Sequence, residues 1–515
     1  MKIGKRFISI SLVVFLLLGV MTGCGSKKEP VNSSKSTGPV PIKIFANFTS
    51  AEQTKVDQAW QKKIEEACNV KLSFEVPPSS GYGERLQVML AGGDYPDVVY
   101  FGSTTDKNFV NSVNNGIIVP VTKYINDAPN LKKYSYDYSF DALKVKENDD
   151  IYGIPRTTVQ RGDGFIIRKD WADAVGFQIP SDNLLTIDQF RDLMTKFSKN
   201  DPDGNGKNDT YGFATSADGE GNLWPIMGYA FGDLGWQKVT GEKYEYMPPM
   251  YDKESPVYKD ELQFTQDLYK NGLLDPNAPS IKHDAAKQRF FQGVTGAIGE
   301  FSGWISQYVA QIAKVNPKAK LTYISGLKNA EGKFQETSFG TGLWGFWAVT
   351  SAAKRPDAIV KLFDYMLSDE GWSLCKDGVK GVSYTEENGV KKPTADYGDF
   401  AQNGWARCFV RRNDDPSFFV ALDTPDEYKD PVTKWIDIAI KAKVVSLDFG
   451  YRPAAADKPE LIDYGKAINQ TVSKIVTGAS PVSDWDKTLD GWYKAGGAEY
   501  VQQMNDYIKK TQDKK

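Results

Sequence analysis

Strand-like and helix-like patterns alternate along this chain, and that alternation restricts the folds open to it. Residues 42–46 and 70–76 alternate apolar with polar side chains, which is the two-residue period of a strand. Residues 97–101 form an apolar run of the kind found in buried strands. Between the first two runs, one helix face is indicated by apolar residues at every fourth position: Val56, Trp60, Ile64 and Cys68. Strands that alternate with helices predict βαβ units, and so an α/β fold built on a mainly parallel sheet.

The same alternation continues through the second half of the chain. Two helix starts have the spacing of a capping box, at residues 50–53 and 186–189. Further strand-like runs lie at residues 165–167, 297–301, 321–324 and 344–349. About 475 residues follow position 41, roughly three times the usual domain size, so more than one domain is expected.

The N-terminus has the composition of an export signal. Three basic residues among the first six precede an uncharged apolar run at residues 7–20, and small residues then lead to Cys24. This order predicts a secretory signal peptide over residues 1–23, because the apolar run is shorter than the roughly 20 residues that span a bilayer. A cysteine after small residues resembles a bacterial lipobox, which implies cleavage before Cys24 and lipid on its thiol. An uncleaved signal anchor with an incidental cysteine is the alternative.

Residues 24–41 form a polar segment after the signal. They are rich in Ser, Gly, Pro and Lys, so they cannot bury enough apolar surface to fold. We expect a lipid-anchored flexible linker that holds the remaining chain at the outer face of the bacterial cytoplasmic membrane.

The charge balance and the histidine count argue against several classes of function. The net charge of −3 gives no concentrated basic surface for nucleic acid. His283 is the single histidine, so a Ser-His-Asp triad, a Cys-His pair or a zinc H-E-x-x-H site would have to use it. It lies at a polar helix entrance, where we expect an exposed or capping role. The chain also has 12 Trp and 26 Tyr, and flat aromatic faces cover the C–H faces of sugar rings, which favours carbohydrate as a ligand.

The remaining cysteines do not describe a disulfide scaffold. Cys68, Cys375 and Cys408 are an odd number and lack C-x-x-C spacing. We expect three buried thiols, with a pair between Cys375 and Cys408 as the alternative.

Residues 201–209, with the sequence DPDGNGKND, have the spacing of a calcium loop. Oxygen donors stand at positions 1, 3, 5 and 9 and glycine at position 6, as in an EF-hand, where position 7 contributes its carbonyl. Position 12 is Gly212 instead of a bidentate Glu, so another ligand is needed or the position-9 carboxylate serves twice. We expect a structural Ca²⁺ ion, with a hydrated turn without metal as the alternative. The predicted ligands are Asp201, Asp203, Asn205, Lys207 through its carbonyl, and Asp209.

Four stretches between residues 90 and 372 form an ordered set of motifs. They are residues 90–99 (LAGGDYPDVV), residues 116–121 with 151–155, residues 167–171 with 186–190, and residues 344–372 with the run RPDAIVKLFDYMLSDEGW. Behind a lipobox, this set resembles the extracellular solute-binding lipoproteins of bacterial carbohydrate ABC importers, among them the alginate-oligosaccharide type.

The resemblance implies a two-lobed α/β fold with a ligand cleft between the lobes and hinge closure around the solute. The expected N-terminal lobe is residues 42–160 plus about 300–350. The expected C-terminal lobe is residues 161–299 plus about 351–515.

Residues at strand ends are the candidates for the cleft, because ligands of α/β sheets bind beyond the carboxyl ends of the strands. Indoles there can stack on sugar rings while carboxylates accept hydroxyl protons. Core packing is the alternative role of each tryptophan. The candidate substrate-binding residues are Asn47, Phe101, Asp163, Trp224, Glu300, Trp304, Trp344 and Trp347.

The expected function is that of a monomeric substrate-binding protein, not an enzyme, which captures an oligosaccharide and delivers it to the permease of an ABC importer. A lipid-anchored glycosidase or lyase is one alternative, since it shares an aromatic cleft but needs a carboxylate pair or a Tyr/Lys base. A peptide- or metal-chelate-binding protein is the other.

Overall fold

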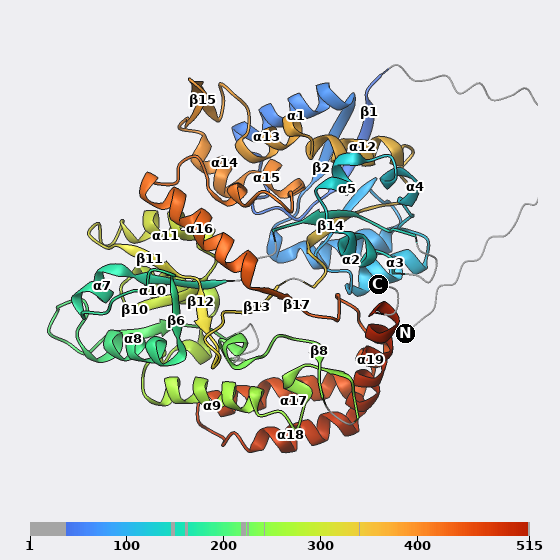
Figure 1. The fold of residues 1–515 in the computed structure, drawn as a ribbon. Helices are drawn as coiled ribbons and strands as arrows, with labels where there is room; N and C mark the ends of the chain where they lie inside the picture. Colours follow the sequence, from blue (N-terminus) through green and yellow to red (C-terminus); the bar gives the residue numbers. More distant parts are fainter. Residues whose placement is uncertain are drawn as a thin grey trace, which may run out of the picture. The chain divides into compact units, whose positions relative to one another are not determined.

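Two mixed β-sheets organise the chain in the computed structural model, which describes residues 38–145, 150–159, 163–217, 223, 226–240, 243–338 and 340–512. The first sheet has the strand order β2-β1-β3-β14-β4 (Figure 1). Its strands are β1 (Val40–Phe45), β2 (Val70–Glu75), β3 (Val98–Phe101), β4 (Ile154–Thr157) and β14 (Leu343–Val349). Strand β1 runs parallel to β2 and β3, whereas β14 is antiparallel to β3 and β4.

The second sheet has the strand order β11-β5-β10-β7. Its strands are β5 (Gly164–Arg168), β7 (Tyr211–Ala214), β10 (Thr295–Glu300) and β11 (Leu321–Ile324). Strand β5 is antiparallel to β10 and β11, and β10 is parallel to β7. The expectation of a mainly parallel sheet is therefore wrong. Two parallel neighbours need a crossover connection that returns to the same sheet. The chain instead reaches β5 after it leaves the first sheet and β14 after it leaves the second, and both strands run antiparallel to their neighbours.

The side chains of β5 are buried on both faces of the second sheet. Successive strand residues point to opposite faces, so Phe165 and Ile167 join one core and Ile166 joins the other. Helices α7 (Lys169–Ala174), α8 (Ile187–Lys199) and α9 (Val257–Lys270) contribute to the first of these cores. Helices α10 (His283–Phe291), α11 (Ile305–Ile312) and α16 (Asp426–Ala442) contribute to the second.

The core of the first sheet is packed with α1 (Lys55–Cys68), α12 (Pro356–Met366), α13 (Asp369–Asp377), α14 (Tyr397–Asn403) and α15 (Ala406–Phe409). The predicted face of α1 is confirmed for its three buried residues, Val56, Trp60 and Ile64.

Two predicted helix caps have different outcomes. Helix α8 begins with the predicted box of Thr186 and Gln189. Helix α1 is instead capped by Thr54 and Asp57, so the box expected at residues 50–53 is wrong. The Asp57 carboxylate also accepts the backbone N–H of Ala406 at 3.0 Å, which ties the start of α1 to α15.

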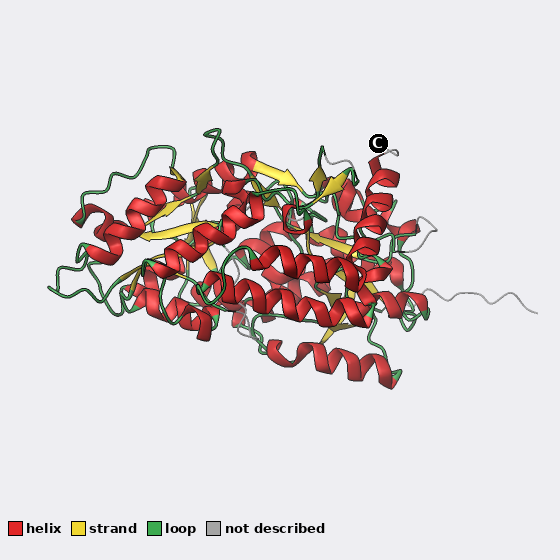
Figure 2. Ribbon diagram, turned by 90° about the horizontal axis from the view of Figure 1, so that it is seen from below, coloured by secondary structure: helices red, strands yellow, loops and turns green. Residues whose placement is uncertain are grey.

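A fourth core lies among the C-terminal helices α17 (Pro459–Val476), α18 (Asp484–Trp492) and α19 (Ala498–Gln512). Helix α17 packs against α18 and α9, and the three lie side by side in Figure 1. Seen from below, long helices lie in front of the strands (Figure 2).

The other elements are short. The helices are α2 (Tyr82–Gly92), α3 (Lys107–Asn114), α4 (Thr122–Ile125), α5 (Pro129–Lys133) and α6 (Asp137–Asp141). The strands pair two by two: β12 (Gly326–Lys328) with β6 (Leu184–Thr186), β13 (Glu336–Ser338) with β17 (Lys443–Val445), β15 (Tyr384–Glu387) with β16 (Val390–Pro393), and β8 (Gln237–Lys238) with β9 (Tyr246–Met247). In the described ranges, no helix is both long and apolar enough to cross a membrane.

Strand pairing shows which sheet each strand joins but does not define the lobes, so the predicted lobe boundaries remain a prediction. Two stretches belong to a different sheet or core from the one that the predicted boundaries suggest. Strand β11 belongs to the second sheet, and helices α12 to α15 pack on the first. The reason is that the chain returns to the first sheet only at β14 and then contributes to the first core as far as Phe418, before it reaches α16.

Candidate functional site

A cavity of 520 Å³ lies where the first sheet meets residues 448–452 and α19. One wall is formed by Tyr100 at the end of β3 and by the loop residues 102–105. The entry to β14 forms the second wall, with residues 340, 341, 343, 344 and 346. The opposite wall is formed by residues 448 and 450–452 together with Tyr500 of α19. The cavity thus lies at the carboxyl end of β3, and ligands of α/β sheets bind at such strand ends.

Trp344 reaches this cavity because of a bulge in β14. The pairing of β14 with β4 shifts register between Leu343 and Phe346, and Gly345 within the bulge has a φ of 90°. A Cβ on Gly345 would lie 2.2 Å from the Tyr100 hydroxyl, so glycine is required there. The extra residue lets Trp344 point outward, 38% exposed, while the next two side chains enter the core.

The backbone of Trp344 is held by two donors. The Tyr100 hydroxyl donates to its carbonyl at 3.0 Å, and Nη1 of the buried Arg156 donates to the same oxygen at 2.8 Å. Both lone pairs of the carbonyl are therefore used. The indole at the cavity wall is fixed at its base, although its ring is exposed.

The opposite wall depends on a turn with two residues of positive φ, Phe449 and Gly450. A Cβ on Gly450 would lie 2.5 Å from Cγ2 of Thr341, so glycine permits the two walls to approach closely. The turn presents the exposed Tyr451, whose ring stacks on Tyr507 of α19 at 4.0 Å with an interplanar angle of 5°. This wall is therefore an aromatic surface supported by α19.

An ion-pair chain links that wall to the first sheet. Arg452 donates to Asp457 at 2.9 Å, and Lys107 of α3 pairs with the same carboxylate oxygen at 2.8 Å. Hydrogen bonds from Lys107 and Arg452 lower the pKa of Asp457, which keeps it charged.

The polar groups of the cavity suit a ligand with many hydroxyl groups. The hydroxyls of Ser103 and Thr105 lie 2.8 Å apart, and Asp448 offers a carboxylate from the opposite wall. Burial, followed by the charge of Asp448, raises the pKa of Tyr500 despite Arg452, so this phenol stays a neutral hydroxyl. Donors and acceptors beside aromatic faces can bind a polar ring compound without any chemical step.

Two predicted site residues lie in the core of the first sheet. Phe101 is 1% exposed and packs against Phe109 and Phe346. Trp347 is fully buried, stacks on Phe409, and donates from Nε1 to the Phe409 carbonyl at 2.8 Å. For both, packing in the core is the role that the structure gives.

Glu300 and Trp304 lie at the end of β10, away from the cavity lining. Trp304 is 39% exposed in a 3-10 turn, Ser302–Trp304. The Glu300 carboxylate accepts from the Tyr308 hydroxyl at 2.6 Å and lies 2.8 Å from Nε2 of His283. Burial raises the pKa of Glu300, but the bonds from His283 and Tyr308 outweigh it and lower the pKa below its usual value. His283 itself is half-exposed and follows the cap residue of α10.

The remaining predicted ligand contacts are scattered. Asn47 follows β1 and is half-buried. Asp163 is exposed, and its backbone N–H donates to Glu336 at 3.0 Å. Trp224 and the predicted lipidation site Cys24 lie outside the described residues. Of the seven predicted residues that the structure describes, one, Trp344, lines the cavity.

The predicted calcium loop folds as a turn around the Asn205 amide. Nδ2 of Asn205 donates to Asp203 at 2.8 Å and to Asp209 at 3.2 Å, while its Oδ1 accepts the N–H of Lys207. Asp201 accepts the N–H groups of Asn205 and Gly206. Desolvation and then the neighbouring Asp201 and Asp209 raise the pKa of Asp203. In the part of the chain that the structure describes, no group of three or more His, Cys, Asp or Glu side chains is arranged to hold a metal ion.

Cys68, Cys375 and Cys408 are free thiols, so the alternative of a Cys375–Cys408 pair is wrong, and the burial predicted for all three is confirmed only for Cys375. Cys375 is buried, and Cys68 and Cys408 are partly buried. Burial raises the pKa of Cys68 to about 11 and that of Cys375 to about 12, so both are unreactive thiols at neutral pH.

The sequence analysis missed the wall at residues 448–452 and the phenol of Tyr500. Tyr500 lies in a helix whose apolar spacing indicates only a core face. The run Asp448-Phe449-Gly450-Tyr451 offers a weak signal, a glycine between aromatic residues that marks a turn.

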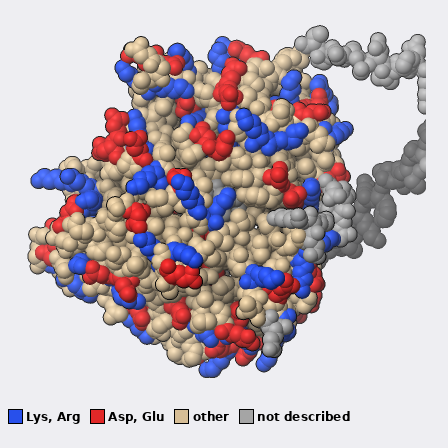
Figure 3. All heavy atoms as spheres, in the orientation of Figure 1, with Lys and Arg blue, Asp and Glu red and all other residues tan. Residues whose placement is uncertain are grey.

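Charged side chains do not form a large field of one sign on the face drawn in Figure 3. Lys and Arg are interspersed with Asp and Glu among the described residues there. The described residues on this face therefore provide no large field of one sign that would steer a charged ligand.

An open cavity at strand ends, lined by aromatic and hydroxyl side chains, suits a polar solute. The chain belongs to the bacterial extracellular solute-binding protein family, whose model matches residues 50–371. It is 24% identical over 526 residues to the polygalacturonan/rhamnogalacturonan-binding protein YtcQ of Bacillus subtilis, with 99% of this chain and 100% of the relative covered.

Solved structures show the same fold. The alginate-binding protein AlgQ2, in a structure without calcium ion, has a TM-score of 0.66 at 21% identity and covers 92% of this chain and 99% of its own. FusA of Streptococcus pneumoniae, an ABC-transporter substrate-binding protein in complex with kestose, has a TM-score of 0.67 at 17% identity and covers 92% and 100%. The predicted two-lobed α/β fold is confirmed.

Proposed function

We propose that the protein is the substrate-binding component of a carbohydrate ABC importer, and that it captures an oligosaccharide and delivers it to a membrane permease. The observation that supports this proposal most directly is the cavity, whose two walls present the exposed aromatic side chains Trp344 and Tyr451. Sugar rings present apolar C–H faces to such surfaces and hydroxyl groups to Ser103, Thr105 and Asp448. The names of YtcQ and FusA support a saccharide ligand.

The protein performs no chemistry on its ligand in this proposal. Its contribution to transport is affinity together with a change of form, because hinge closure around the solute distinguishes loaded from empty protein for the permease. It acts as a monomer, tethered through lipid on Cys24 and the linker at residues 24–41.

A thermal-shift screen of the purified protein against neutral and acidic oligosaccharides tests this proposal. A ligand present at 100 times its Kd stabilises the folded form by about 2.7 kcal/mol, which raises Tm by about a degree or more. We expect a shift with one class of oligosaccharide and recovery of that saccharide intact. Cleavage of the saccharide would make the protein an enzyme, and no shift with any saccharide would contradict the proposal.

A structural Ca²⁺ ion in the loop of residues 201–209 is a second part of the proposal. Three carboxylates and the Lys207 carbonyl fit the oxygen preference of calcium. Asn205 has its amide nitrogen toward Asp203 and Asp209, so a half-turn of the amide supplies the fifth oxygen. The ion would stabilise the loop by offsetting the repulsion between neighbouring carboxylates.

Melting curves with calcium and with a chelator test this site. We expect a lower Tm in chelator and nearly unchanged saccharide affinity, since the loop lies outside the cavity lining. Asp203→Asn should remove the response to calcium, whereas Asp188→Asn, at an exposed carboxylate of α8, should keep it. Equal melting of the unaltered protein in calcium and in chelator would refute the calcium site.

A further inference from the structure

Helix α9 buries a carboxyl group that has no hydrogen-bond donor beside it. Glu261 is 5% exposed, and its Oε2 atom is buried without a hydrogen-bond partner among the described residues. The group packs against Gly228 in the 3-10 turn Gly228–Phe231, since a Cβ on that glycine would lie 2.6 Å from Oε2. An ionised carboxylate in such a place is so unfavourable that the group takes up a proton instead.

A second carboxyl group, that of Asp233, lies on the same turn. The backbone N–H of Asp233 donates to the Gly228 carbonyl at 3.0 Å, so both acidic residues converge on Gly228. Asp233 is half-buried, and its carboxylate accepts the backbone N–H of Gly235 at 3.1 Å. Two negative charges this close to one another disfavour the ionised form of the more deeply buried group, Glu261.

A phenol faces the same place from one turn earlier in α9. Tyr258 and Glu261 are three residues apart, so they share one face of the helix. Tyr258 is 4% exposed, and its hydroxyl is buried without a partner in the described ranges. Burial, then the charges of Glu261 and Asp233, raise the pKa of Tyr258, and Tyr251 of the 3-10 turn Pro249–Tyr251 adds to the effect. The titratable neighbours of Glu261 are therefore acids themselves.

The elements packed on α9 bring no cation to this place. Helices α17 and α18 share the apolar fourth core with α9. The lysines of the region pair with other carboxylates, Lys259 with Asp486 and Lys253 with Asp490. In the part of the chain that the structure describes, Glu261 is in no ion pair. Its charge would stay uncompensated.

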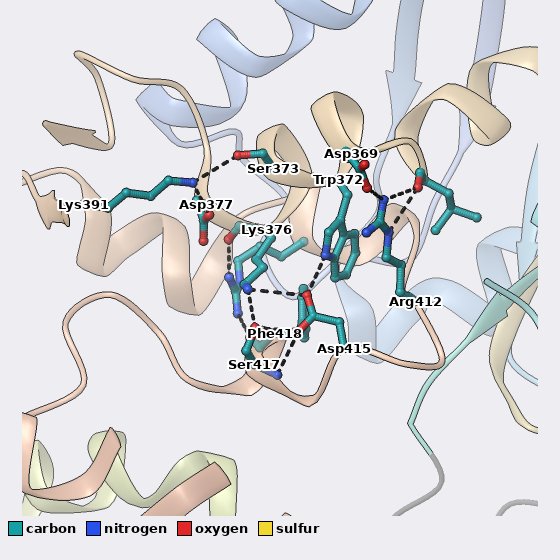
Figure 4. A network of polar contacts seen from close by, with 12 residues as sticks. Asp369, Trp372, Ser373, Lys376, Asp377, Lys391, Arg412, Asp415, Ser417 and Phe418 are labelled. Atoms are coloured by element: carbon teal, nitrogen blue, oxygen red, sulfur yellow. Dashed lines mark hydrogen bonds and ion pairs between the residues drawn. The ribbon is translucent and has the colours of Figure 1, made fainter. Parts of the chain in front are cut away.

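A carboxylate elsewhere in the molecule shows what compensation requires (Figure 4). Asp415 accepts from Trp372 Nε1 at 2.7 Å and from Lys376 at 3.4 Å. Burial raises the pKa of Asp415, but its hydrogen bonds and the charge of Lys376 outweigh burial and lower the pKa. At Glu261, burial and then the charge of Asp233 act in the same direction and raise the pKa well above its usual range.

The turn that carries Asp233 also supports the cavity wall. The backbone N–H of Trp236 donates to the Ser446 hydroxyl at 2.9 Å, and that of Leu447 donates to the Trp236 carbonyl at 2.9 Å. Residues 448–452, which form one wall of the cavity, follow directly. A change in the Asp233 turn is therefore passed to that wall through two hydrogen bonds.

We propose that Glu261 and Asp233 together hold one proton in the folded protein at neutral pH, carried by Glu261, and that this proton keeps the Asp233 turn closed against the cavity wall. Release of the proton to solvent leaves two charged carboxylates beside Gly228, and their repulsion loosens the turn that joins Trp236 to Ser446. Glu261 is thus a positioning residue, which acts on the cavity through the turn. The inference goes beyond the proposed function and does not depend on which ligand the cavity takes.

Infrared difference spectra of the unaltered protein and Glu261→Gln at pH 7 test for the proton directly. A protonated carboxyl group has a C=O stretch that is separate from the bands of carboxylates. We expect one such band that Glu261→Gln lacks. Glu254→Gln makes the same change at an exposed carboxylate just before α9 and should keep the band. Asp233→Asn should keep it at pH 7 but lose it at a lower pH than the unaltered protein, because the neighbouring charge is gone. Identical spectra for the unaltered protein and Glu261→Gln would overturn the proposal.

Melting curves from pH 5 to pH 9 test the matching change in stability. The folded pKa of Glu261 is raised above the unfolded value for glutamate, about 4.3. The stability that its proton supports is therefore complete below that value and is lost as the pH rises toward the folded pKa. The Tm of the unaltered protein should fall relative to that of Glu261→Gln as the pH rises, and Glu254→Gln should follow the unaltered protein. Parallel profiles for the unaltered protein and Glu261→Gln would overturn the proposal.

Hydrogen–deuterium exchange of residues 445–452 tests the link to the cavity wall. The comparison is made at pH 7 and at a pH above the midpoint at which the infrared band disappears. We expect equal exchange in the unaltered protein and Glu261→Gln at pH 7, and faster exchange in the unaltered protein at the higher pH. Equal exchange at both pH values would overturn the role of the proton in positioning the wall.

Discussion

Trp344 and Trp347 are three residues apart in β14 and have opposite environments. Trp347 is fully buried among Phe48, Phe363 and Phe409, and its indole N–H is hydrogen-bonded. Trp344 is 38% exposed at the cavity, and its backbone carbonyl accepts hydrogen bonds from Tyr100 and Arg156. A bulge at one glycine thus divides a strand into a part packed in the core and a part whose indole is exposed at the cavity.

The largest expected effect is at the buried indole. Trp347→Ala removes a large side chain from a close-packed aromatic core and should lower the free energy of unfolding by about 3–5 kcal/mol. Denaturant unfolding measures the change, with Trp344→Ala as the paired control. A loss no larger than that of Trp344→Ala would break the distinction between the two positions.

The next effect concerns the bulge itself. Gly345→Ala places a Cβ against the Tyr100 hydroxyl at a φ of 90°, so it should destabilise by about 1–3 kcal/mol. It should also weaken saccharide binding because Trp344 would no longer be held at the cavity. Gly332→Ala is the control, since Gly332 also has a positive φ but has open space around its Cβ. Equal losses for both glycines would mean that backbone strain alone matters and that the contact with Tyr100 does not.

A smaller effect is expected at Tyr100, which contacts both tryptophans. Its hydroxyl donates to the Trp344 carbonyl, and its ring contacts Trp347 edge to face at 5.2 Å. Tyr100→Phe keeps the ring and removes one of two donors, so unfolding should become easier by about 1 kcal/mol. Saccharide affinity, measured by calorimetry, should fall as well; an unchanged affinity would mean that Arg156 alone holds Trp344 in place.

Trp344→Ala should cost less stability than Trp347→Ala, because the Trp344 ring is 38% exposed whereas that of Trp347 is fully buried. The saccharide affinity of Trp344→Ala should fall at least tenfold, which corresponds to about 1.4 kcal/mol. Fluorescence or calorimetric titration measures the affinity, and Trp304→Ala tests whether the second exposed indole contributes. Retained affinity in both variants would separate the ligand site from the exposed indoles.

The smallest effect is a pH dependence at the opposite wall. The pKa of Asp457 is lowered by Lys107 and Arg452, so its contribution to stability is present above the unfolded pKa of an aspartate, about 3.9. That contribution is lost as the pH falls through the lower folded pKa. Melting curves of the unaltered protein and Asp457→Asn should therefore differ slightly at pH 7 and converge in acid. A difference that grows in acid would contradict this sign.

Sequence patterns predicted individual elements well where one local signal decides them. The apolar run at residues 165–167 forms a strand buried on both faces, and the box at Thr186 caps a helix. The order of strands was not predictable, because β14 inserts between β3 and β4 after more than a hundred intervening residues. Periodicity indicates which faces are apolar but not which sheet a strand joins.

The site was less predictable for a related reason. Trp344 and Trp347 have the same side chain, and the bulge at Gly345 that separates them depends on Tyr100 from a distant strand. Likewise Tyr451 and Tyr500 meet the cavity only after the C-terminal helices pack. Strand-end reasoning selected Phe101, which directly precedes the lining residues Gly102 and Ser103, yet the side chain of Phe101 turns into the core.

The measurement that tests the account most directly is a crystal structure of the protein with the oligosaccharide that raises its Tm most. The account predicts a sugar ring against the Trp344 indole, hydroxyl groups toward Ser103 and Asp448, and Trp347 unchanged in the core. A saccharide bound elsewhere, with Trp344 still exposed to solvent, would contradict it.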